Sequence, residues 1–223
     1  MIVVRYDEKR CCAMLVWMTD TRTFAQLADA IRATSGPVRL VGVDGCGGAG
    51  KTTFAQRLGA AGGWTVVHTD DFATHDDAFG WWPRMLTEVI EPLSQQRSAR
   101  FRPYDWVRRQ LHEEMVTIEP ADVVVIEGVG ATRHAWRDRL ALSVWVDTPR
   151  DVRLARGLAR DGEQMRAFWE WWIAEEDRYV ASEHPQRHAD LVVDGDPSEP
   201  LPDDRFAVLS APREEPARPA SPR

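Results

Sequence analysis

The sequence predicts an α/β fold built around a parallel sheet of five strands. Two observations support this: apolar, β-branched runs recur along the chain, and segments with a helical spacing of apolar residues separate them. Strands connected in this way pair in parallel through right-handed crossovers. The runs expected to be strands are Val38–Val43, Trp64–Thr69, Ala121–Glu127, Ala141–Asp147 and Ala189–Val193.

A glycine-rich stretch, Gly45–Thr52, follows the first of these strands and matches the pattern G-x-x-x-x-G-K-[ST]. Its glycines let successive backbone N–H groups turn toward an anion. We expect Lys51 to reach the outer phosphates of a nucleotide and the Thr52 hydroxyl to bind Mg²⁺. The residues expected to bind ATP are Gly45, Cys46, Gly47, Gly48, Ala49, Gly50, Lys51, Thr52 and Thr53.

The β-branched run before this loop and the helix-like segment 52–61 after it are the context of a phosphate-binding loop. The fold expected is therefore the P-loop NTPase fold. Its five-stranded parallel sheet would have the order 2-3-1-4-5, counting the expected strands along the chain, with flanking helices and a short lid.

The basic residues of the chain are almost all arginine. Of the 28 Lys and Arg residues, only Lys9 and Lys51 are lysines, so a lysine in the loop suggests a need for a compact ammonium group. The net charge is −7, and the arginines are dispersed among acidic residues. This pattern argues against a nucleic-acid-binding surface and favours a small anionic ligand that is held locally.

The three cysteines, Cys11, Cys12 and Cys46, show neither a disulfide framework nor zinc-ligand spacing, and Cys46 is expected to be a small filler residue in the loop. The apolar run 11–18 is too short to span a membrane and lacks the features of a signal peptide, so a cytoplasmic location and no membrane partner are expected.

The expected domain boundaries follow from composition. Residues 1–20 are expected to be an N-terminal extension, with Met14 or Met18 as alternative starts. Residues 21–195 form the single predicted domain, which begins with a helix over 21–34. Proline and charged residues dominate beyond it, and 196–223 is expected to be a disordered tail.

Acidic residues stand at the ends of two expected strands, where an open parallel sheet binds its ligand. Asp70 and Asp71 follow the strand that ends at Thr69, and Glu127 ends another. Asp70 is the candidate base that would deprotonate an acceptor hydroxyl, and Glu127 would support Mg²⁺ through water. The alternative is that these carboxylates are solvated strand-end residues or helix caps.

Three arginines, Arg153, Arg156 and Arg160, lie on one face of the expected helix after Thr148-Pro149. Solvated ion pairs with Asp151 or Asp161 are the simplest interpretation, particularly for Arg153. Arg160 precedes the Asp161-Gly162 break, where a lid would hinge, and a lid arginine can reach the phosphates on closure.

Ten tryptophans are many for 223 residues. Core and helix-face packing is one explanation for them; a flat apolar acceptor pocket is the other. The cluster that suggests a pocket is Trp81, Trp82, Trp106, Trp169, Trp171 and Trp172.

Together with the loop, several segments resemble the uridine kinase family of P-loop kinases, with phosphoribulokinase and pantothenate kinase as more distant relatives. Asp70-Asp71-Phe72 resembles the family's Asp-Ser-Phe-Tyr, in which the first Asp is the base, and Pro103–Trp106 resembles its Pro-x-Tyr-Asp-Phe. Ala121–Gly128 is similar to its Ala-Asp-Val-Val-Leu-Phe-Glu-Gly, and Val146-Asp147-Thr148 is similar to its next strand.

The resemblance implies a kinase that uses ATP and Mg²⁺ to phosphorylate a hydroxyl group, with Asp70, Lys51 and Arg160 as catalytic residues and Thr52 and Glu127 at the metal. It implies a small-molecule partner, no nucleic acid, and a homo-oligomer as a further expectation. The residues expected to contact the acceptor are Asp71, Phe79, Trp82, Tyr104, Trp106 and Arg109.

Three positions depart from the family pattern. Gly80 stands where the family has an aspartate for the ribose diol, Arg109 stands where it has a pyrimidine-reading histidine, and Gly157 stands where it has a lid arginine. A site that loses such hydrogen-bonding groups changes its acceptor. A nucleoside is the favoured acceptor; a sugar, a pantothenate-like compound or an antibiotic is the alternative. A nucleotide-binding switch is a rival function, although the chain has no N-K-x-D motif.

Overall fold

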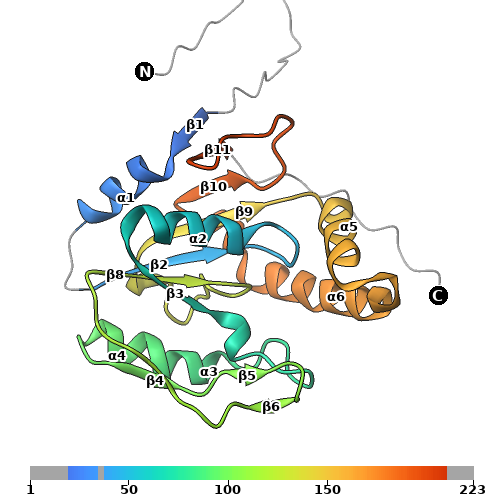
Figure 1. The fold of residues 1–223 in the computed structure, drawn as a ribbon, viewed down its shortest axis with the longest axis horizontal. Helices are drawn as coiled ribbons and strands as arrows, with labels where there is room; N and C mark the ends of the chain where they lie inside the picture. The colour runs from blue at the N-terminus through green and yellow to red at the C-terminus, as the bar shows by residue number, and fades with distance from the viewer. Residues whose placement is uncertain (1–19, 35–37, 210–223) are drawn as a thin grey trace, which may run out of the picture.

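The computed structural model describes residues 20–34 and 38–209. Its main element is a seven-stranded sheet with the order β1-β11-β10-β9-β2-β8-β3 (Figure 1). The five strands predicted from the sequence are β3, β8, β2, β9 and β10, which pair in parallel in the predicted order. The strands are β1 (Asp20–Thr23), β2 (Arg39–Asp44), β3 (Thr65–His68), β8 (Val123–Glu127), β9 (Leu140–Asp147), β10 (Leu191–Asp194) and β11 (Arg205–Leu209).

Helices connect these strands, and two short hairpin-like sheets lie outside the main sheet. One small sheet pairs β4 (Ala99–Phe101) with β7 (Val116–Ile118), and the other pairs β5 (Tyr104–Asp105) with β6 (Gln110–Leu111). The α-helices are α1 (Phe24–Arg32), α2 (Lys51–Gly62), α3 (Trp82–Met85), α4 (Glu91–Ser94), α5 (Arg150–Asp161), α6 (Arg166–Glu183) and α7 (Pro185–His188). The shorter turns are the 3₁₀ helices η1 (Thr69–Asp71), η3 (Arg137–Arg139) and η4 (Glu163–Met165) and the π-helical η2 (Leu86–Ile90).

The central strands are buried on both faces, as their continuous apolar character predicts. Val41 and Val43 of β2 point to one face, where they pack with α1 and α2; Leu40 points to the other face, against the α3–α4 segment. Figure 1 shows α2 over one side of the sheet and α3 and α4 below the other. The two apolar layers hold the carboxyl ends of β2, β3 and β8 at a common edge.

The N-terminal helix is shorter than predicted. Helix α1 begins at Phe24, because Thr23 caps it: the Thr23 hydroxyl accepts from the Gln26 N–H at 3.1 Å and the Gln26 side chain accepts from the Thr23 N–H at 3.0 Å. Residues Asp20–Thr23, placed partly in the helix by the sequence, form β1 instead.

The prediction of a disordered tail is wrong over Arg205–Leu209. This segment forms β11, which pairs antiparallel with both β10 and β1 and so extends the sheet. Phe206 is buried, and its ring centroid lies 5.1 Å from that of Phe24 and 5.3 Å from that of Phe54. The proline-rich composition around it conceals a short apolar strand. Residues 210–223, and the alternative starts at Met14 and Met18, lie outside the described residues.

Replacing Phe206 with leucine is expected to lower the free energy of unfolding by about 1–2 kcal/mol, since the three-ring contact is lost and a small void is left. Denaturant unfolding measures it. A free energy of unfolding equal to that of the wild type would show that the contact of the Phe206 ring with Phe24 and Phe54 adds nothing to the stability of the domain.

Within residues 20–34 and 38–209, no helix has both the length and the apolar character that crossing a membrane requires.

Candidate active site

The loop Gly45–Thr52 joins β2 to α2 and opens the helix at Lys51. Gly48 and Gly50 have φ angles of 77° and 96°, in the left-handed region that favours glycine. A Cβ at Gly48 would also lie 2.5 Å from the Arg153 carbonyl oxygen. These positions therefore require glycine, as the motif predicts. Burial raises the pKa of the Cys46 thiol well above its usual range, which agrees with the filler role expected for it.

A cavity of about 790 Å³ lies beside this loop and brings together residues that are far apart in the sequence. It contains all the residues predicted to be catalytic or to bind the metal, and two of the six predicted acceptor contacts. Those that line it are Lys51, Thr52, Asp70, Glu127, Arg160, Trp106 and Arg109. Asp71, Phe79, Trp82 and Tyr104 do not line it, and their contact with an acceptor stays a prediction.

Thr52 and Glu127 face each other across the carboxyl edge of the sheet. The Thr52 hydroxyl donates to Glu127 Oε1 at 3.1 Å, and Glu127 Oε2 lies 2.6 Å from His68 Nδ1. Burial pushes the pKa of Glu127 upward, but the His68 hydrogen bond and the Lys51 charge outweigh it, so the pKa is lowered. The result is an ionised carboxylate beside a hydroxyl, a set of hard oxygen donors that fits Mg²⁺.

Asp70 lies on the 3₁₀ turn η1, directly after β3. Water reaches its carboxylate through the open cavity, yet the surrounding protein desolvates it and raises its pKa, against the opposing charge of Lys51. The Trp106 indole N–H donates to the Asp70 carbonyl oxygen at 3.1 Å and fixes the turn. Asp71, on the same turn, is half-buried and does not line the cavity, and burial raises the pKa of its carboxyl as well.

The direction of this pKa shift gives a testable pH dependence. A base must be deprotonated to act; because the pKa of Asp70 is raised, kcat/KM is expected to fall on acidification at a higher pH than an ordinary aspartate would cause. A pH profile with saturating Mg·ATP measures it. His68 also titrates at a raised pKa, through its hydrogen bond to Glu127, so a His68→Asn variant that loses the acid limb would contradict the assignment to Asp70.

Aromatic side chains form one wall of the cavity. We call Trp106, Phe168 and Trp172 the aromatic wall; the ring centroid of Trp172 lies 6.4 Å from that of Trp106 and 5.9 Å from that of Phe168. His75 also lines the cavity, with its ring 4.8 Å from Trp106. Arg109 lies in the turn of the β5–β6 hairpin and also lines the cavity. Its own backbone has a φ of 55°, in the left-handed region.

Three of the predicted acceptor residues instead support this wall or the core. Phe79 packs behind the wall, 5.8 Å from Trp172 and 5.7 Å from Tyr179 between ring centroids. The Tyr104 hydroxyl lies 3.1 Å from His75 Nδ1 and so positions the His75 ring. Trp82 packs against the core beneath the sheet.

Two of the departures from the family pattern have a steric explanation. Gly157 lies under the indole of Trp169, and a Cβ there would be 2.3 Å from Trp169 Cε2. Since Trp169 is itself a cavity residue, an aromatic ring occupies the space next to position 157, where a lid arginine has no room. Gly80 lies in a turn whose N–H donates to Asp77 Oδ1 at 2.5 Å; a Cβ there would be 2.4 Å from Asp77 Oδ2.

The predicted break in the lid lies between α5 and α6, at Gly162, which has a φ of 93°. Just before it, the Arg160 guanidinium is bound by Asp161, with nitrogen–oxygen distances of 2.7 and 2.9 Å. The Trp169 indole donates to the same carboxylate at 3.0 Å. Arg160 is therefore exposed at the mouth of the cavity and held in place at the end of α5.

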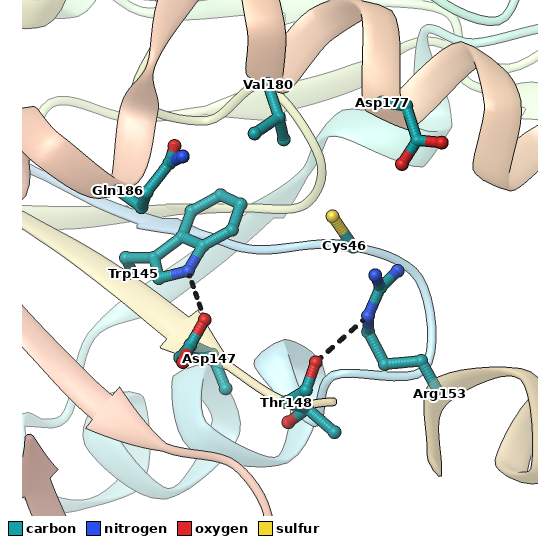
Figure 2. A pocket seen from close by; sticks show the side chains of 9 residues that line it. Cys46, Trp145, Asp147, Thr148, Arg153, Asp177, Val180 and Gln186 are labelled. Atoms are coloured by element: carbon teal, nitrogen blue, oxygen red, sulfur yellow. Dashed lines mark hydrogen bonds between the residues drawn. The ribbon is translucent and has the colours of Figure 1, made fainter. Parts of the chain in front are cut away.

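The other two arginines of this face have different environments. Arg153 is buried, which contradicts the solvated ion pair expected for it: its Nε donates to the Thr148 carbonyl oxygen at 3.1 Å, and its Nη1 lies 3.2 Å from Glu176 Oε2. Figure 2 shows Arg153 beside Cys46. Both residues line a small pocket of about 150 Å³. Arg156 donates to the Gly195 carbonyl oxygen at 2.9 Å and pairs with Asp196. Thr148 donates to the Ala49 carbonyl oxygen at 3.0 Å and does not cap α5.

Sequence reasoning missed a second cavity, of about 350 Å³, on the other side of the loop. It shares Gly48, Gly50, Thr53 and Arg156 with the first cavity, so the two spaces adjoin. Segment 197–207, taken for tail, forms part of its lining. His68 and Glu176 were also missed. An alternation count along β3 could have pointed to His68, but no pattern marks Glu176 within its helix.

A strand–loop–helix motif at the carboxyl edge of a five-stranded parallel core defines a protein of the P-loop fold class. A family model described as phosphoribulokinase/uridine kinase family matches residues 76–200, and the chain belongs to that family. It is 27% identical over 184 residues to a uridine kinase from Halobacterium salinarum, which covers 70% of this chain and 80% of that protein.

Two solved structures share the fold. One, described as a possible uridine kinase from Bacillus stearothermophilus, has 22% identity and a TM-score of 0.58 and covers 76% of this chain and 96% of that one. The other, described as a candidate fructose transport system kinase from Silicibacter sp. TM1040, has 20% identity and a TM-score of 0.54 and covers 73% of this chain and 95% of that one. These similarities confirm the predicted family and fold class.

Proposed function

We propose that this protein is an ATP- and Mg²⁺-dependent kinase that transfers the γ-phosphoryl group to a hydroxyl of a small molecule. One observation carries the proposal. A single cavity is lined by the loop lysine, by a hydroxyl–carboxylate pair suited to Mg²⁺, by a carboxylate with raised pKa, and by an arginine at the mouth. These are the parts that phosphoryl transfer needs.

The nucleotide side uses the loop and the second cavity. Loop N–H groups and the Lys51 ammonium would hold the β- and γ-phosphates, and the nucleobase would lie in the adjoining 350 Å³ space beside Arg156. Thr52 and Glu127 would hold Mg²⁺, which neutralises charge on the phosphate oxygens when bound. Glu127 is fixed for this role by its contacts with both Thr52 and His68.

Asp70 would orient the acceptor hydroxyl and take its proton. The acceptor oxygen then forms a bond to the γ-phosphorus as the bond from that phosphorus to the β–γ bridging oxygen breaks; ADP leaves, and the proton remains on Asp70. Lys51 and Arg160 stabilise the negative charge on the transferred group. The raised pKa of Asp70 makes it a stronger base than a fully solvated aspartate.

The acceptor would bind against the aromatic wall, which suits a flat ring. A nucleoside is the favoured acceptor; a sugar, a pantothenate-like compound or an antibiotic is the alternative. The printed descriptions of the relatives include both a uridine kinase and a fructose transport system kinase. Trp169 in the space of the lid arginine, and Arg109 in place of the histidine, favour an acceptor other than uridine. A homo-oligomer and a cytoplasmic location stay predictions.

An acceptor screen tests the proposal. ADP release is followed in a coupled assay, with Mg·ATP and a panel of nucleosides, sugars, pantothenate-like compounds and hydroxyl-bearing antibiotics, and the phosphorylated product is identified by mass. Acceptor-dependent ADP release with a product 80 Da heavier, about the mass of an added HPO₃ group, is expected. Slow ADP release that no acceptor stimulates would favour a nucleotide-binding switch instead.

A further inference from the structure

Glu176 is a fully buried carboxylate on α6 that contacts three elements bordering the cavity. Its Oε1 accepts from the Gly47 backbone N–H at 2.5 Å and from the Trp172 indole N–H at 2.7 Å. Its Oε2 accepts from Arg153 Nη1 at 3.2 Å. A buried charge persists only where hydrogen bonds and an opposite charge satisfy it, and here the donors come from the loop, from α5 and from α6 itself.

The contact with Gly47 is close. A Cβ at Gly47 would lie 3.0 Å from Glu176 Oε1 and 3.1 Å from Trp169 Cζ3, so α6 packs directly on the loop backbone. The Gly47 N–H belongs to the run of amides that would otherwise turn toward a phosphate. With that N–H bound to a protein carboxylate, the direction of the loop at its second glycine is set by α6.

The same carboxylate oxygen also binds a residue of the aromatic wall. Trp172 lines the cavity and contacts Trp106, whose indole N–H in turn donates to the Asp70 carbonyl oxygen. A continuous set of contacts therefore runs from the loop through Glu176 and the wall to the turn that carries the candidate base. Glu176 is fully buried and both tryptophans are half-buried, so close packing restricts the arrangements that these side chains can adopt.

We propose that Glu176 is a positioning residue that fastens the phosphate-binding loop to the aromatic wall and so sets the affinity for the nucleotide. The nucleotide part of this inference rests on the proposed function. A glutamine at this position offers one acceptor oxygen where glutamate offers two, so either Gly47 or Arg153 loses its hydrogen bond to residue 176. Loss of a hydrogen bond to a charged group in a buried site lowers the equilibrium constant for the closed, hydrogen-bonded loop by a factor of about ten or more.

The test compares Glu176→Gln with Glu175→Gln, the same substitution one residue earlier, where the side chain pairs with Arg178 on the outer side of α6. Hydrogen exchange of a peptide over residues 45–50 is measured by mass spectrometry on the nucleotide-free, full-length protein. Glu176→Gln is expected to speed exchange of this peptide about tenfold and to raise the Kd for Mg·AMP-PNP by a similar factor. Glu175→Gln is expected to match the wild type in both.

Trp172→Phe is the second variant, since it leaves the Glu176–Arg153 pair in place and removes the indole N–H that donates to Glu176, while a smaller aromatic ring remains in the wall. It is expected to speed exchange at 45–50 by about threefold, with a Tm close to that of the wild type. If Glu176→Gln does not fold, Trp172→Phe provides the test. An exchange rate of residues 45–50 in Trp172→Phe equal to that of the wild type would overturn the proposal. Equal exchange in folded Glu176→Gln and Glu175→Gln would also overturn it.

The two proposals fail separately. A wild-type protein that does not bind Mg·AMP-PNP contradicts the kinase function, whereas the exchange comparison on nucleotide-free protein still tests Glu176. If Glu176 only stabilised the fold, Glu176→Gln would lower the Tm and speed hydrogen exchange throughout α5 and α6. Exchange of residues 45–50 would then increase no more than exchange elsewhere.

Discussion

Replacing Asp70 with asparagine is expected to lower kcat by about 10²–10⁴-fold while the Kd for Mg·ATP stays close to that of the wild type. Asparagine keeps the shape and the position on η1, but its amide cannot take the proton of an acceptor hydroxyl. The nucleotide contacts proposed here come from the loop, Thr52 and Glu127, which this change does not touch. Steady-state kinetics with the acceptor from the screen, and calorimetry with Mg·AMP-PNP, measure the two quantities.

Asp71→Asn is the matched comparison, because Asp71 is the adjacent carboxylate on the same turn and does not line the cavity. Its effect on kcat is expected to be at least about tenfold smaller than that of Asp70→Asn. A larger loss in Asp71→Asn than in Asp70→Asn would reverse the assignment of the base. Full activity in Asp70→Asn would remove Asp70 from the mechanism.

The loop, the parallel strands and their strand-end carboxylates could be predicted from the sequence because each depends on local pattern or on topology. Apolar runs in this chain are long enough to mark buried strands, and a parallel sheet brings its carboxyl ends together whatever the detailed packing. Asp70, Lys51, Thr52 and Glu127 therefore came together in one cavity as expected.

Residues whose position depends on side-chain packing between distant elements could not be predicted. Phe79 and Tyr104 were predicted to contact the acceptor but do not line the cavity; the Phe79 ring packs against Trp172, and the Tyr104 hydroxyl lies beside His75 Nδ1. Arg153 looks like a surface arginine within its helix, and only the fold places it opposite Glu176, 23 residues later, in a buried pair. Strand β11 was missed because residues 196–223 as a whole are rich in proline and charge. That average conceals the five residues Arg205–Leu209, which form the strand.

The second large effect is expected at Lys51. Its side chain is buried, and its ammonium donates to the Cys46 carbonyl oxygen at 3.1 Å, within the turn of the loop. Its stem is confined as well, since a Cβ at Gly45 would lie 3.3 Å from Lys51 Cγ. An ammonium is a compact point charge, whereas a guanidinium is a broad plane that needs several partners in its own plane. The space inside the loop suits the former.

Lys51→Arg is therefore expected to lower kcat/KM by about 10²–10³-fold, although the charge is conserved, because the cation no longer meets the phosphate oxygens in the transition state. Kinetics at varied Mg·ATP measure this loss. Arg32→Lys serves as the control exchange, since Arg32 forms an exposed ion pair with Asp29 on α1, a kind of pair that contributes little. If Lys51→Arg were as active as the wild type, the presence of a lysine in the loop of such an arginine-rich chain would reflect no chemical need, and a positive charge of any shape would suffice there.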